Sequence, residues 1–168
     1  MNFKTNTLIS LTALLVLQGC VEYRDDPACA KANYLTFEEF RAKGVEVLPP
    51  QEIDKAGKIY VYGDLLFVSE ANRGVHVIDN SDKKNPQPKK FLKIPGNLDM
   101  AVKDGYLYVD SYMDLVVIDI KDIENIKEVN RKTDTFTYDP YQSANGESYF
   151  YGQCDFDTTK GVIVGGDN

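Results

Sequence analysis

A pattern of short apolar runs is written twice in the middle of the chain, and it constrains the fold more than any other feature. Leu66 in the first copy stands over Leu107 in the second, an offset of 41 positions, and Asp79 stands over Asp119, an offset of 40. A self-similar period near 40 residues made of short strands is typical of β-propeller blades. The sequence therefore predicts an all-β protein built from antiparallel blades of a β-propeller.

The pattern predicts four strands in each of two blades, with turn residues between them. In the first blade, residues 57–96, strands are expected at 59–62, 65–69, 75–79 and 90–94. In the second blade, residues 97–131, strands are expected at 100–103, 106–110, 115–120 and 126–130. The third run of each blade is apolar almost throughout, which suits a strand covered on both faces, as in stacked blades.

Two blades do not close a propeller ring, which typically has about 4–8 blades. An open pair leaves apolar faces and strand edges exposed, and both favour aggregation. Three arrangements satisfy the pattern: the chain is part of a longer propeller, it completes itself by oligomerising, or its two sheets pack together as a small sandwich. Residues 132–168 form a partial third element, with a long connection at 133–152 and a strand at 161–165.

Residues 34–56 lead into the first blade and start with one short predicted helix. Thr36 is followed three residues later by Glu39, which is the spacing of a capping box, and Gly44 suits the helix end. A helix of residues 37–43 is marginal on its own, so its apolar side must dock on another element. We expect it to pack on the first blade, and the alternative is a lid.

The N-terminus reads as a bacterial export signal. Residues 1–19 hold a short basic start and an apolar run too short to span a membrane. The following Leu17–Cys20 resembles the lipobox of bacterial lipoproteins, which implies a palmitoyl-type lipid anchor on Cys20. The alternative is a plain secretory signal with an incidental cysteine. Val21 after the cysteine favours the outer membrane, and residues 20–33 read as a tether.

The two other cysteines, Cys29 and Cys154, lie far apart in the sequence. An exported chain reaches a compartment that permits disulfides. A Cys29–Cys154 disulfide would tie the tether to the end of the chain and stabilise it by closing a long loop. The alternative is two separate thiols.

The composition argues against several classes of function. A formal net charge of −7 leaves no basic patch to neutralise phosphates, so no nucleic-acid partner is expected. His76 is the only histidine and lies inside a predicted strand, so we expect no catalytic residues, metal or cofactor. Residues 155–161 carry side-chain oxygens at alternate positions, as a calcium-binding loop needs, but the glycine falls one place late. A polar turn is therefore the better interpretation. Asp79 and Asp119 are expected to cap turns rather than bind a cation or sugar.

Tyrosine is plentiful, with 11 residues, whereas tryptophan is absent. An exposed tyrosine suits contact with a protein or glycan, because its ring is apolar and its hydroxyl polar. Tyr138 and Tyr141 lie in a predicted loop and are the residues we expect to contact a partner. The alternative is that they fill blade interfaces.

The repeated strands resemble the LVIVD repeat. The signature is carried by residues 74–82 and by Leu115-Val116-Val117-Ile118-Asp119, an almost literal second copy. Residues 57–63 and 94–97 resemble the N-terminal part of LVIVD-repeat lipoproteins of Gram-negative bacteria. The resemblance implies a β-propeller fold and an envelope location, but no catalytic residues. Lys84 stands where the repeat has its first proline, which weakens a turn but not the strands.

We therefore expect a membrane-anchored lipoprotein that is a non-catalytic binding or scaffolding module for an envelope protein or polysaccharide. One alternative is part of a propeller hydrolase or lyase whose catalytic blades are missing from this chain. The other is that the chain has no independent function.

Overall fold

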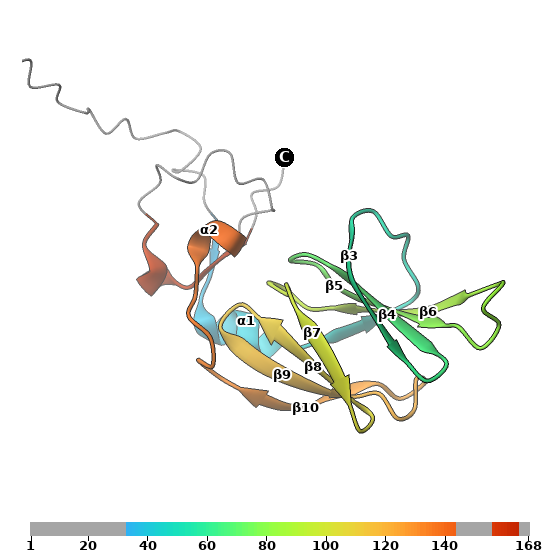
Figure 1. Ribbon diagram of the computed structural model, residues 1–168. Helices are drawn as coiled ribbons and strands as arrows, with labels where there is room; N and C mark the ends of the chain where they lie inside the picture. The colour runs from blue at the N-terminus through green and yellow to red at the C-terminus, as the bar shows by residue number, and fades with distance from the viewer. Residues whose placement is uncertain (1–32, 144–155, 165–168) are drawn as a thin grey trace, which may run out of the picture.

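The computed structural model describes residues 33–143 and 156–164, which form two antiparallel sheets and a small third one (Figure 1). The first sheet has the order β2-β6-β5-β4-β3, from β2 (Glu46–Leu48), β3 (Ala56–Tyr62), β4 (Leu65–Glu70), β5 (Gly74–Asp79) and β6 (Gln87–Lys93). The second has the order β10-β9-β8-β7, from β7 (Met100–Lys103), β8 (Tyr106–Ser111), β9 (Asp114–Asp119) and β10 (Lys127–Lys132). The all-β prediction is confirmed, and β2 adds a strand outside the predicted first blade.

Several predicted features fall outside the described residues. They are the signal at 1–19, the lipidated Cys20, most of the tether, and both Cys29 and Cys154. Among the residues that the structure describes, no helix is long and apolar enough to cross a membrane.

The two repeats close their third turns with the same side-chain hydrogen bonds. Asp79 accepts from the backbone N–H of Ser81 at 3.0 Å, and Asp119 accepts from that of Lys121 at 3.0 Å. Both aspartates therefore cap turns, as predicted. Three residues further on, Asp82 and Asp122 make a second bond of the same kind, which fixes the turn where the repeat's proline is absent.

The core lies between the two sheets and is made of aliphatic and aromatic side chains from both. Phe67 of β4 and Val77 of β5 are fully buried on one side, and Leu107 of β8 and Val116 of β9 on the other. The first strands of the repeats are also joined, since the Tyr60 hydroxyl donates to the Val102 carbonyl at 3.2 Å. The sheets thus pack as neighbouring blades.

The faces that meet in this core are not equivalent in the repeat. Phe67 is buried between the sheets, but its counterpart Tyr108 lies on the opposite face of the second sheet. Conversely, Leu107 is buried between the sheets, whereas its counterpart Leu66 lies on the far face of the first. Successive propeller blades stack in this head-to-tail way, whereas a two-fold sandwich would pair equivalent faces.

The predicted helix is α1 (Phe37–Lys43), and its capping box is present: the N–H of Glu39 donates to Thr36 Oγ1 at 3.2 Å, and the N–H of Thr36 to Glu39 Oε2 at 2.9 Å. The expectation that it packs on the first blade is wrong. Phe40 meets the ring edge of Tyr112 at 5.4 Å between centroids, so α1 packs on the second repeat. The reason is a buried carboxylate there that pairs with an arginine of the helix.

The predicted C-terminal strand is β11 (Val162–Val164), which pairs with β1 (Asn33–Leu35) in a two-stranded sheet. Ahead of it, Asp157 accepts from the N–H of Thr159 at 3.1 Å and caps a 3₁₀ turn at Thr158–Lys160. This agrees with a polar turn rather than a calcium loop for the part of 155–161 that is described. A further one-turn helix, α2 (Pro140–Ser143), follows the second repeat.

Candidate functional site

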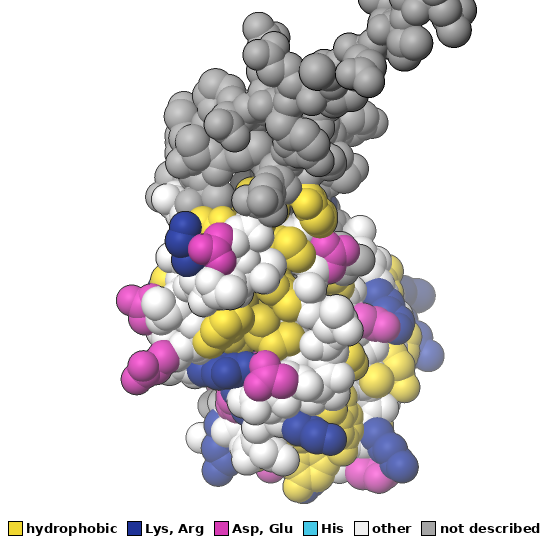
Figure 2. All heavy atoms as spheres, turned by 90° about the vertical axis from the view of Figure 1, so that its left-hand side faces the viewer, with side chains coloured by type: hydrophobic (Ala, Val, Ile, Leu, Met, Phe, Trp, Pro, Cys, Tyr) yellow, Lys and Arg dark blue, Asp and Glu magenta, His cyan; other side chains and the backbone are white. Residues whose placement is uncertain are grey.

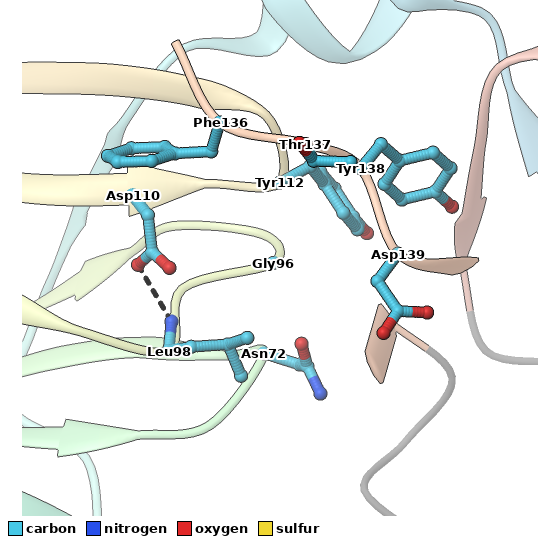
Figure 3. A pocket seen from close by; sticks show the side chains of 9 residues that line it. All are labelled: Asn72, Gly96, Leu98, Asp110, Tyr112, Phe136, Thr137, Tyr138 and Asp139. Carbon is cyan, nitrogen blue, oxygen red and sulfur yellow. Dashed lines mark hydrogen bonds between the residues drawn. The ribbon is translucent and has the colours of Figure 1, made fainter. Parts of the chain in front are cut away.

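A pocket of about 180 Å³ opens at the end of the repeats where their connecting loops meet (Figure 3). Its walls come from the β4–β5 turn, the link from the first sheet to the second, the end of β8 with the β8–β9 turn, and the segment after β10. The lining residues are Asn72, Gly96, Leu98, Asp110, Tyr112, Phe136, Thr137, Tyr138 and Asp139. Loops of both repeats therefore build one site.

Asp110 forms the acidic wall of the pocket and is held from one side. Its Oδ1 accepts from the N–H groups of Leu98 at 2.8 Å and Asp99 at 2.9 Å, and from the side-chain amide of Asn97 at 2.9 Å. Burial raises the pKa of Asp110 above the usual range of an aspartate, against the effect of these hydrogen bonds. The carboxyl group is thus fixed in place by backbone donors.

Tyr112 forms the aromatic wall and occupies a strained backbone position, with φ of 54°. A bulky residue with positive φ is uncommon and is often found at functional sites. Its ring lies against Gly96, where a Cβ atom would come within 2.6 Å of the ring atoms. Burial and the nearby Tyr138 raise the pKa of Tyr112 to about 12, so its hydroxyl stays protonated.

The remaining aromatic residues of the loop segment have different environments. Phe136 lines the pocket and is 46% exposed. Tyr138 also lines it, packs on the ring of Tyr112 at 6.0 Å, and its hydroxyl accepts from the N–H of Ile163 at 2.7 Å. Tyr141 is 43% exposed, packs on Phe156 and lies outside the lining. Of the two predicted contact residues, the structure places one in the pocket, and partner contact stays a prediction for both.

A buried ionic network holds this loop segment and α1 on the second repeat. The fully buried Asp114 accepts from Arg41 Nε at 3.0 Å and Nη2 at 2.9 Å, and from Arg131 Nη1 at 3.3 Å. Burial alone would raise the pKa of Asp114, but the hydrogen bonds and charges of the arginines hold it below the usual range. Nearby, the N–H of Phe136 donates to the Met113 carbonyl at 2.9 Å, which fixes the pocket wall.

His76 takes no part in the pocket. It lies in β5 with 3% of its surface exposed, and its Nε2 is 3.2 Å from Glu70 Oε2. Glu70 also accepts from the N–H groups of Asp54 and Lys55 and pairs with Arg73. This cluster anchors the segment before β3 to the first sheet. No group of three candidate metal ligands occurs among the described residues.

Sequence reasoning missed Asn72, Asp110, Phe136 and Asp139, which all line this site. For Asp110 a signal was present, because it stands at the repeat position of Ser69. Ser69 Oγ accepts from the N–H of Lys58 at 2.9 Å, the same bond that Asp110 makes in the second repeat. A carboxylate in place of a hydroxyl was the detectable difference. Phe136 lies outside the repeat and carried no such signal.

Two stacked, unclosed sheets, one of five strands and one of four, with a shared loop pocket define a β-propeller-like repeat protein. Residues 54–90 and 98–131 each match the LVIVD repeat, so the chain is a protein with LVIVD repeats, as its strand signature indicated. No curated protein and no solved structure matches the chain.

Proposed function

We propose that this protein is a non-catalytic binding module of the bacterial envelope that holds a partner protein through the pocket between its repeats. The observation that carries the proposal is the composition and origin of that pocket. Loops of both repeats converge on it, and aromatic rings and carboxylates line it together. A rigid scaffold that presents a site on its loops is the usual architecture of a binding protein.

The chemistry of the pocket favours a cationic group. Asp110 and Asp139 supply carboxylates, Phe136 and Tyr112 supply ring faces, and no lysine or arginine is among the described residues that line the pocket. A cation is attracted to both carboxylates and aromatic faces. The pocket is small beside the roughly 300–1,000 Å³ of sites for whole ligands. A lysine or arginine side chain of the partner fits these constraints.

The binding proposal is tested with short fluorescent peptides, one rich in lysine and arginine and one acidic, and with a neutral oligosaccharide. The protein is the chain from residue 20 with Cys20→Ser, studied by fluorescence anisotropy. The basic peptide should bind, and Asp110→Asn or Phe136→Ala should weaken it, by about tenfold for a desolvated cation–aromatic contact. Ile53→Ala, at an exposed site outside the lining, is the matched control. If only the oligosaccharide binds, the partner is a glycan and the proposal of a protein partner is wrong.

Membrane anchoring is the second part of the proposal and is supported by the lipobox-like Leu17–Cys20 and the apolar run before it. Two or more acyl chains on Cys20 would hold the protein on the outer membrane. A clickable palmitate analogue fed to cells should label the wild-type chain and not Cys20→Ser, which should leave the membrane fraction. A wild-type chain that stays unlabelled and soluble would reject the anchor but not the pocket.

A further inference from the structure

The first sheet carries aliphatic side chains on a face that no described strand covers. Ile59 and Val61 on β3 are each 61% exposed. Their counterparts in the second repeat, Met100 and Val102 on β7, are only 3% and 6% exposed, because they pack between the sheets. We call Ile59, Val61 and the half-buried Leu66 the first open face. This face carries the kind of side chains that form the contact between the two sheets, but no described strand packs on it.

The second sheet carries apolar side chains on the face that is turned away from the first sheet. Tyr108 and Val117 pair across β8 and β9 and are half-buried. Their counterparts Phe67 and Val77 are fully buried between the sheets. With Leu115, they form the second open face. Figure 2 looks from the side away from the first sheet and shows hydrophobic side chains gathered in a band between charged groups.

The existing contact between the sheets shows that these two kinds of face fit each other. Within the chain, the Phe67 face of the first repeat packs on the Met100 face of the second. The second open face is the repeat counterpart of the Phe67 face, and the first open face is the counterpart of the Met100 face. The two open faces are therefore the same complementary pair, separated on opposite sides of one molecule.

The segment before β3 leaves enough of the first open face exposed for such a contact. The N–H groups of Asp54 and Lys55 in this segment bind Glu70, so the segment covers only the end of that side of the first sheet, where Glu70 and His76 lie. The part that carries Ile59 and Val61 remains exposed.

We propose that the first open face of one copy of this chain binds the second open face of another copy, head to tail. Such a contact uses two different patches, so it continues from copy to copy until the rotation closes a ring. Closure would give a propeller-like ring, and two copies already supply four blades, the lower end of the usual range of about 4–8. The contact does not depend on the binding function proposed for the pocket.

The test is the mass of the chain from residue 20, with Cys20→Ser, by light scattering across a concentration series. The wild type should form a discrete assembly of whole copies. Val61→Glu places a charge in the first open face and Val117→Glu in the second, so each should weaken assembly by about 100-fold or more. Tyr141→Glu, at an exposed site outside both faces, should leave the mass unchanged.

Mixing the two variants separates a head-to-tail contact from a symmetric one. Each variant keeps one intact face, so an equimolar mixture should form a 1:1 dimer and nothing larger. Circular dichroism melts confirm that each variant is folded, and Val61→Thr, which keeps strand propensity, serves if the charged variant unfolds. A wild-type chain that is monomeric at all concentrations would overturn the proposal. So would an assembly that ignores Val61→Glu and Val61→Thr, or a mixture of folded variants that stays monomeric.

Discussion

Replacing Asp114 by alanine tests whether the buried ionic network holds the N-terminal helix on the second repeat. The carboxylate is completely buried and accepts from Arg41, from Arg131 and from the N–H of Asp134 at 3.1 Å. Among the described residues, no other ion pair joins α1 to a sheet. We therefore expect Asp114→Ala to lower the free energy of unfolding and to loosen α1.

The size of the effect depends on which acidic partners the two arginines keep when Asp114 is removed. Removing one partner of a buried pair typically costs about 3–5 kcal/mol, because the other charge stays buried. Here Arg41 is 26% exposed and keeps its ion pair with Asp134, and Arg131 keeps two hydrogen bonds to Glu128, at 2.9 Å and 3.0 Å. Because neither arginine is left without an acidic partner, the lower end of this range applies, and we expect a loss of about 3 kcal/mol.

The assay is urea unfolding followed by circular dichroism, since the chain has no tryptophan. The midpoint should fall while the slope with urea stays constant, which marks a change of stability alone. The control is Glu46→Ala, which breaks a 2.9 Å pair with Lys93 whose side chains are about half exposed. An exposed pair contributes at most about 1 kcal/mol. If Asp114→Ala costs no more than this control, the reasoning about the network is refuted.

The same residue gives a pH dependence with a defined sign. The pKa of Asp114 is lower in the folded chain than in the unfolded one, so its contribution to stability is complete above the unfolded value of about 3.9. It is lost as the pH falls through the lower folded value. Wild type should therefore lose stability below about pH 4 faster than Asp114→Ala does.

Three further predictions concern the pocket and the cysteines. Gly96→Ala should cost about 1–3 kcal/mol in urea unfolding, because φ is +72° and the new Cβ would meet the Tyr112 ring; a neutral effect would contradict the close packing. Asp110→Asn keeps the Oδ1 acceptor and removes a charge whose pKa is raised, so it should melt no lower than wild type at pH 7, with any advantage vanishing near pH 4. A Cys29–Cys154 disulfide should make the intact mass of the chain rise by about 2 Da on reduction; an unchanged mass would mean two thiols.

Local patterns predicted most of the elements. Alternating and continuous apolar runs placed eight strands of the two repeats, because the side-chain period of a strand is written in consecutive residues. The capping box of Thr36 and Glu39 placed α1 for the same reason, since both bonds span three residues. Neither kind of signal says what an element packs against.

The candidate site was predicted only in part. Tyr138 was singled out as a loop tyrosine, and it does line the pocket. Asn72, Asp110 and Phe136 reach the same pocket from segments up to 64 positions apart in numbering, and no local pattern relates such distant residues. Their meeting depends on how the second sheet stacks on the first.

Local sequence patterns were enough to predict the strand content, the repeat, the turn-capping aspartates and the short helix, because each rests on contacts between near neighbours in the chain. Tertiary structure alone decided that α1 crosses to the second repeat, where Arg41 meets Asp114 at a separation of 73 positions, and that β2 extends the first sheet beyond β6. It also decided which face of each sheet is buried. The alternation of side chains defines two faces for every strand, and only the stacking of one sheet on the other selects which face leaves water.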